Sequence, residues 1–173
     1  MRWLPFQLNP DLPESGIPRE EYVERKFGSR GKGVNERVVL AGRQLGISFE
    51  YGKMLVQPNT LNAHRLMLYA ERDGKQDQLA EELFRAHFSE GANLTDAETL
   101  AELAARAGLD RKAVADYLAG DEGREAIARA EVEARSAGIG GVPFFIFNRK
   151  IGVSGAQDAD TLLNAMEQAL SEG

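Results

Sequence analysis

The sequence predicts an α/β protein in which a long helical block separates a short first strand from a β-hairpin and a closing helix. Three observations support this class. Aromatic and aliphatic residues dominate residues 2–8, apolar residues recur at helical spacing over 59–137, and a dense β-type run follows at 142–147. With 173 residues and 43% hydrophobic content, the chain is long enough to bury a core.

The first predicted element is a strand over residues 2–8, which the turn residues at 9–13 bring to an end. The chain therefore begins almost inside a strand. A second, weak extended segment is expected at 47–51.

Helices account for most of the middle of the chain, and capping residues mark their ends. Gly46 stands in the C-cap role, and Asn59 or Thr60 caps the first helix of the helical block. Thr95 and Glu98 have the spacing of a capping box. The expected helices span about 18–27, 34–45, 59–72, 110–119, 121–137 and 160–170, and two more begin near Asp77 and Thr95.

The β-type run at 142–147 is followed by a hairpin. Asn148 and Arg149 supply a tight turn, and residues 150–153 can return antiparallel to the run. The closing amphipathic helix at 160–170 then completes a hairpin and helix unit.

The resulting order is strand, helical block, hairpin and helix. A thioredoxin fold consists of strand, helix and strand, followed by helix, hairpin and helix. The second half is complete here, whereas the first half has only its last strand. Residues 1–58 and 121–173 are thus interpreted as an incomplete thioredoxin-like domain with connecting helices, and 59–120 as an inserted helical domain.

Charge and composition exclude several function classes. A net charge of -6 without a Lys/Arg cluster argues against nucleic acid as a partner. No apolar run approaches the roughly 20 residues of a membrane span. The first six residues are too short and too interrupted by proline for a signal peptide, so no membrane contact and a cytoplasmic location are expected.

The chain contains no cysteine, which removes disulfides, thiolate nucleophiles and cysteine-type zinc sites together. Only His64 and His87 are available as imidazole ligands. We therefore expect no metal site and no cofactor.

The most informative stretch for chemistry surrounds Pro143. A proline at the start of a central strand cannot donate to the ladder and so needs a special role. A cis bond at Val142-Pro143 is one such role, because it turns the Val142 N–H and C=O outward toward an extended ligand. A trans proline that begins an edge strand is an equal alternative on local sequence.

Four blocks of sequence resemble the FrnE-like branch of the DsbA family and together span nearly the whole chain. They are RWLPFQLNP at 2–10, PNTLNAHRL at 58–66, GIGGVPFF at 138–145 and VSGAQ at 153–157. The resemblance implies a thioredoxin-like (DsbA-type) α/β fold with a large inserted helical domain, in which the first β-α unit is absent from this chain.

The resemblance also implies where the site lies. The family's catalytic C-x-x-C would stand upstream of Arg2, so no catalytic residue is expected in this chain. The pair Val142-Pro143 matches the cis-proline loop that faces the active site. The substrate-binding residues expected on this basis are Gly141, Val142, Pro143, His64 and Gln157.

His64 admits two interpretations. It shares a helix face with Leu61 and Leu68, and a packing or surface histidine is the more frequent case for such a position. The matching block in the family instead suggests a group that borders the active-site groove. His87, beside Phe84 and Phe88, is interpreted as structural.

Three functions compete. The first is a FrnE-like thiol-disulfide oxidoreductase or isomerase, inactive in this chain alone. The second is a glutathione-binding relative of the kappa-class transferases and 2-hydroxychromene-2-carboxylate isomerases, and the block at 155–157 favours the first over it. The third is a non-catalytic binding module. The expected partners are a thiol or disulfide protein or peptide, glutathione, or a second copy that completes the sheet.

Overall fold

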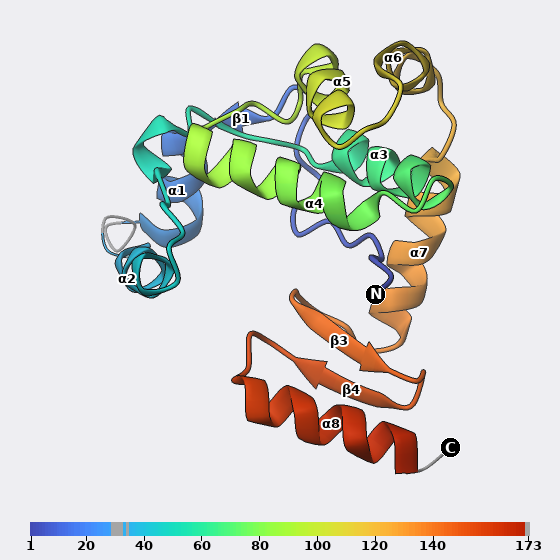
Figure 1. Ribbon diagram of the computed structural model, residues 1–173. Helices are drawn as coiled ribbons and strands as arrows, with labels where there is room; N and C mark the ends of the chain where they lie inside the picture. The colour runs from blue at the N-terminus through green and yellow to red at the C-terminus, as the bar shows by residue number, and fades with distance from the viewer. Residues whose placement is uncertain (29–32, 34, 172–173) are drawn as a thin grey trace. The chain divides into compact units, whose positions relative to one another are not determined.

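The computed structural model describes residues 1–28, 33 and 35–171 (Figure 1). The chain divides into two compact units, Met1–Ile127 and Ala128–Gly173, and each is described by itself. In the described residues no helix is long and apolar enough to cross a membrane. The predicted domain boundaries at 58 and 121 stay a prediction.

The first unit is mainly helical. Its elements are β1 (Ile17–Pro18), α1 (Arg19–Phe27), α2 (Glu36–Gln44), the 3-10 turn η2 (Tyr51–Lys53), β2 (Val56–Gln57), α3 (Leu61–Glu71), α4 (Gln76–Arg85), the π-helical turn η3 (Ala86–Glu90), α5 (Ala97–Arg106), α6 (Arg111–Ala119) and the start of α7 (Arg124–Ser136). The predicted helices are confirmed within a few residues at each end. Val34, the predicted start of the second helix, lies outside the described residues.

The core of this unit lies among helices α3 to α6. Leu66, Leu79, Leu100 and Val114 are fully buried, one from each of these helices. The faces expected from apolar spacing are therefore the faces that pack. Burying each such aliphatic side chain contributes about 1.5 to 3 kcal/mol.

The N-termini of α5 and α6 are both capped by an aspartate. Asp110 is the N-cap of α6, at the predicted start of that helix, and its carboxylate accepts the Ala113 N–H at 2.6 Å. The predicted capping box at Thr95 is wrong, because Asp96 is the N-cap of α5 and accepts the Thr99 N–H at 2.8 Å. The Thr95 hydroxyl instead bonds the Asn93 side chain. An ionised Asp is as good a cap as Thr, and it stands one residue closer to the helix.

The strand predicted at residues 2–8 is wrong. These residues pair with no strand in the described structure. The buried amide of Gln76 takes the place of a ladder partner: its Oε1 accepts the Trp3 N–H at 3.1 Å and its Nε2 donates to the Trp3 carbonyl at 3.2 Å. One side-chain amide thus satisfies both backbone groups of Trp3, as a paired residue in an antiparallel sheet would.

A second amide, that of Asn59, holds the other end of the same segment. Its Oδ1 accepts the Leu61 N–H at 2.9 Å and the Gln7 side-chain amide at 3.1 Å, and its Nδ2 donates to the Leu12 carbonyl at 2.6 Å. Asn59 therefore serves the start of α3, as expected, and also fixes the chain before α1.

The extended segment predicted at 47–51 is also corrected. Residues 47–50 are irregular, and Tyr51 begins the turn η2. The strand in this region is β2, which pairs antiparallel with β1. Each of these strands has two residues, too few for an alternating pattern to be visible in the sequence.

Arg65 is fully buried and ties α3 to the end of α6. Its guanidinium donates to the carbonyls of Tyr117 at 3.0 Å, Leu118 at 3.2 Å and Gly120 at 2.5 Å. Its Nε donates to the Glu122 carbonyl at 2.8 Å. These carbonyls include the last groups of α6, where the helix dipole places negative charge, so the buried cation is stabilised without a carboxylate.

The second unit contains the end of α7, the strands β3 (Phe144–Phe147) and β4 (Ile151–Ser154), and α8 (Ala159–Ser171). The predicted hairpin is confirmed, with Phe145 opposite Val153. Asn148 and Arg149 both have positive φ, at 49° and 59°, which makes the tight reversal that the turn requires. Helix α8 lies along the hairpin (Figure 1), and the Asn148 side chain donates to the Ala169 carbonyl at 3.1 Å.

Replacing Arg65 should cost more than replacing a neighbouring arginine. We expect Arg65→Met to lower the free energy of unfolding by about 3 kcal/mol or more, because several buried carbonyls lose their donor. Arg72→Met is the matched control, since Arg72 also lies over the Tyr117 ring but pairs with Glu122 in solvent. Its cost should be below about 1 kcal/mol. Urea unfolding measures both, and equal losses would contradict this account of Arg65.

The side chain of Gln76 can be tested in the same way. Gln76→Glu keeps an acceptor for the Trp3 N–H but removes the donor to the Trp3 and Met67 carbonyls. We expect a loss of about 1 to 3 kcal/mol and a red shift in the fluorescence of Trp3, which is the chain's one tryptophan. Gln78→Glu, on the exposed side of α4, should leave both unchanged. An unshifted spectrum in Gln76→Glu would show that this amide does not hold the segment.

Candidate functional site

The residues expected at the site lie in two places. Gly141, Val142 and Pro143 precede β3 in the second unit, and Gln157 lies in the same unit between β4 and α8. His64 lies on α3 in the first unit. Only the group in the second unit is brought together by short-range contacts.

The loop before β3 is pinned at one end and open at the other. The Val142-Pro143 peptide is cis, the geometry considered for this loop in the sequence. The Gly155 N–H donates to the Pro143 carbonyl at 2.9 Å and so joins the loop to the end of β4. Val142 is 47% exposed, and within the described residues its own N–H and C=O have no hydrogen-bond partner. Val142 therefore presents a free donor and a free acceptor next to a fixed point.

Gln157 lies in the connection that follows β4. Its Nε2 donates to the Ser154 carbonyl at 2.9 Å, so its amide holds the turn around Gly155. The next residue, Asp158, accepts the Thr161 N–H at 2.8 Å at the start of α8, and this hydrogen bond lowers the pKa of the Asp158 carboxyl. Gln157 thus supports the residue that pins Pro143.

Gly155 fixes the loop before β3, and the sequence did not single it out by itself. Its φ is 83°, in the left-handed region that favours glycine, and this conformation directs its N–H to the Pro143 carbonyl. The glycine in the block VSGAQ was the available signal for a turn, but its partner 12 residues earlier could not be identified from spacing.

His64 is held close to the N-terminal segment. Burial lowers the pKa of its imidazole to about 4, although a hydrogen bond with the Phe6 backbone acts in the opposite direction. The ring is therefore neutral near pH 7. A neutral imidazole that hydrogen-bonds the backbone fits the packing interpretation of His64, and it leaves open a role as an uncharged polar neighbour of a substrate.

His87 has the structural setting expected for it. It is buried, its Nδ1 lies 3.2 Å from the Ala92 carbonyl, and its ring packs against Phe88. Burial lowers the pKa of His87 as well.

The cis-proline loop, the hairpin β3-β4 and the closing helix α8 have the order of the second half of a thioredoxin-fold protein. A family model described as a DSBA-like thioredoxin domain matches residues 1–167. The chain therefore belongs to that family. The resemblance to the DsbA family noted in the sequence is thereby confirmed.

A solved structure gives the same fold. The crystal structure of a probable DsbA oxidoreductase from Streptomyces coelicolor is similar to this chain, with a TM-score of 0.89 and 28% sequence identity. The similarity covers 98% of this chain and 75% of the Streptomyces chain. A comparison with curated protein sequences gives no match.

The buried His64 predicts a specific loss of stability in acid. The unfolded chain takes up a proton near pH 6.5, whereas the folded chain resists it until about pH 4, so stability falls as pH drops through this window. Between pH 7 and pH 4.5 the loss due to His64 should be about 2 to 3 kcal/mol. His64→Gln should lose less over the same range.

Urea unfolding of both proteins at several pH values makes the comparison. Carboxyl groups such as Asp158, whose pKa values are lowered, affect stability at lower pH and are shared by both proteins. Parallel pH dependences would show that His64 titrates normally in the folded chain.

Proposed function

We propose that the protein acts in thiol-disulfide exchange as a FrnE-like member of its family, and that this chain supplies the substrate-facing loop. The observation that carries the proposal is the family match over residues 1–167. The similarity to a structure described as a probable DsbA oxidoreductase supports it.

Chemistry limits what the chain does alone. Thiol-disulfide exchange begins when a thiolate attacks a disulfide sulfur and expels the other sulfur as a thiolate. The sequence contains no cysteine. The attacking sulfur therefore has to come from outside these 173 residues, and the chain by itself is proposed to be inactive.

The proposed substrate contacts follow from the loop geometry. An extended segment of a thiol or disulfide protein would pair its backbone with the free N–H and C=O of Val142, beside Gly141. Pro143 and Gln157 would keep this edge in place through the bond from Gly155. His64 is proposed as an uncharged group that borders the substrate.

Two other proposed partners remain. Glutathione is a peptide with a thiol and could use the same backbone groups. A second copy of the chain could add a strand to the hairpin, because in the described structure β3 pairs with β4 alone.

The proposal predicts an activity that depends on added cysteines. The purified chain should not reduce insulin in the presence of dithiothreitol faster than the reductant alone. A fusion that places a strand-helix unit with C-x-x-C ahead of Met1 should gain turnover, and the same fusion with S-x-x-S is the matched control. Glutathione added to the fusion should compete with insulin if it uses the loop.

Two outcomes would count against the proposal. Turnover by the chain itself, with intact mass confirming zero cysteine, would require another chemistry. A folded C-x-x-C fusion without any turnover would remove the oxidoreductase interpretation.

A further inference from the structure

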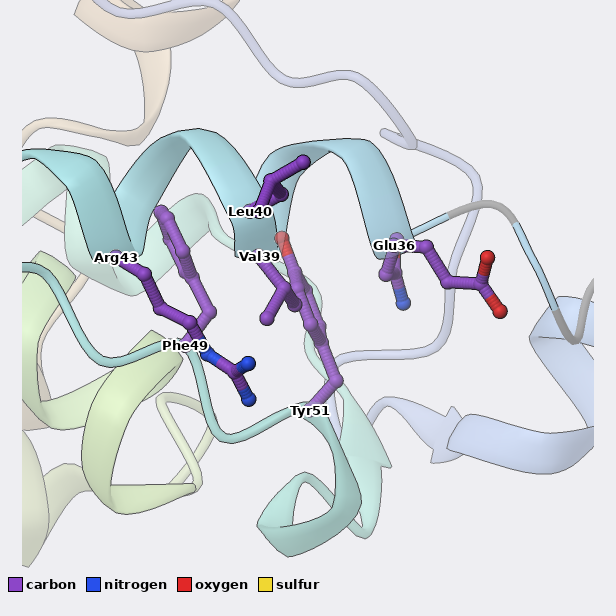
Figure 2. A pocket seen from close by; sticks show the side chains of 7 residues that line it. Glu36, Val39, Leu40, Arg43, Phe49 and Tyr51 are labelled. Atoms are coloured by element: carbon purple, nitrogen blue, oxygen red, sulfur yellow. The ribbon is translucent and has the colours of Figure 1, made fainter.

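An open hollow of about 490 Å³ lies in the first unit, between α2 and the segment that leads to η2. Val39, Leu40 and Arg43 line it from α2, and Phe49 and Tyr51 line it from the segment (Figure 2). The function proposed above does not use it.

One wall of the hollow is aromatic and fixed. The rings of Phe49 and Tyr51 are stacked, with centroids 5.7 Å apart and planes 11° apart. Phe88 meets both edge to face, at 6.0 and 6.2 Å, and its carbonyl accepts the Glu50 N–H at 2.8 Å. A wall that is already ordered loses little conformational entropy when a ligand binds.

Close packing also fixes the distance between α2 and this wall. A Cβ added at Gly42 would stand 2.5 Å from the Phe49 ring, so only glycine permits this approach. The Gly42 carbonyl also accepts the Ile47 N–H at 2.8 Å, which holds the connecting loop.

The helix contributes two opposite charges to the hollow. Glu36 and Arg43 are seven residues apart, which places them on one face and about 10 Å apart along the axis. Figure 2 shows the two residues toward opposite ends of α2, with the side chain of Arg43 reaching in between Phe49 and Tyr51. In the part of the chain that the structure describes, neither has a salt-bridge partner.

We infer that this hollow binds an extended peptide segment with the pattern acidic, x, aromatic, x, basic. Alternate side chains of an extended peptide share a face, and four residues span about 13 Å, a length that the long side chains of Arg43 and Glu36 can match. The acidic residue would pair with Arg43, the basic residue with Glu36, and the ring would lie on Phe49 and Tyr51. The inference rests on the proposed function for one point only, namely that such segments come from substrate proteins.

A peptide is favoured as the occupant because two opposite charges flank an aromatic wall in an open hollow, and an extended peptide can present a charge on each side of a ring. A second copy of the chain is the competing occupant, since Leu40 and Leu45 of this region are exposed. Light scattering at the protein concentrations of the titration distinguishes the two.

The test is a fluorescence-anisotropy titration with cysteine-free labelled nonapeptides that differ only in the two charged residues. The wild-type chain should bind the Asp/Lys peptide about fivefold more tightly than the Lys/Lys peptide. Arg43→Glu should invert this preference in favour of Lys/Lys. Arg37→Glu, an equal charge change on the same helix outside the hollow, should keep the wild-type order.

Because these peptides lack sulfur, the result is independent of thiol exchange. A binding preference that Arg43→Glu does not invert, a peptide with Ala in place of Phe that binds equally well, or binding that tracks self-association would each overturn the inference. A folded C-x-x-C fusion that shows no insulin turnover would overturn the proposed function, and the peptide-binding data would not be affected.

Discussion

The first unit depends on the buried guanidinium of Arg65. Isolated charge is costly in a protein interior, and this cation is stabilised by backbone carbonyls at the end of α6 and just beyond it. The same contacts satisfy carbonyls that a helix end leaves unpaired. Because Arg65 belongs to α3, the register of α3 against α6 is fixed by hydrogen bonds, and the apolar residues between them pack in one arrangement.

The side-chain amides of Gln76 and Asn59 hold the N-terminal segment in a similar way, through hydrogen bonds to the backbone. Each supplies a donor and an acceptor to partly buried backbone groups. The segment is held between α4 and the start of α3, and the Phe6 backbone forms a hydrogen bond with His64. His64 stays neutral near pH 7 because it is buried, and the hydrogen bond with the Phe6 backbone only partly offsets the effect of burial on its pKa.

In the second unit, hydrogen bonds also fix a loop, but fewer of them are involved. A single bond from Gly155 to Pro143 joins the loop before β3 to the end of β4, and Gln157 holds the turn that makes this bond possible. The adjacent Val142 keeps its backbone groups open. A fixed loop beside an open donor and acceptor suits the recognition of extended chains in general, which is why family membership is needed to choose thiol-disulfide exchange among the functions of such a loop.

The sequence by itself determined the helices, the hairpin and the lack of a thiol, because periodicity, turn residues and composition are local properties. It also indicated the loop at Pro143, through the resemblance of four short blocks. Tertiary structure decided that residues 2–8 form no strand, that Asp96 and not Thr95 caps α5, and that Gly155 pins Pro143. The first case shows the reason: the groups that satisfy Trp3 belong to Gln76, 73 residues away, and the folded chain alone brings such partners together.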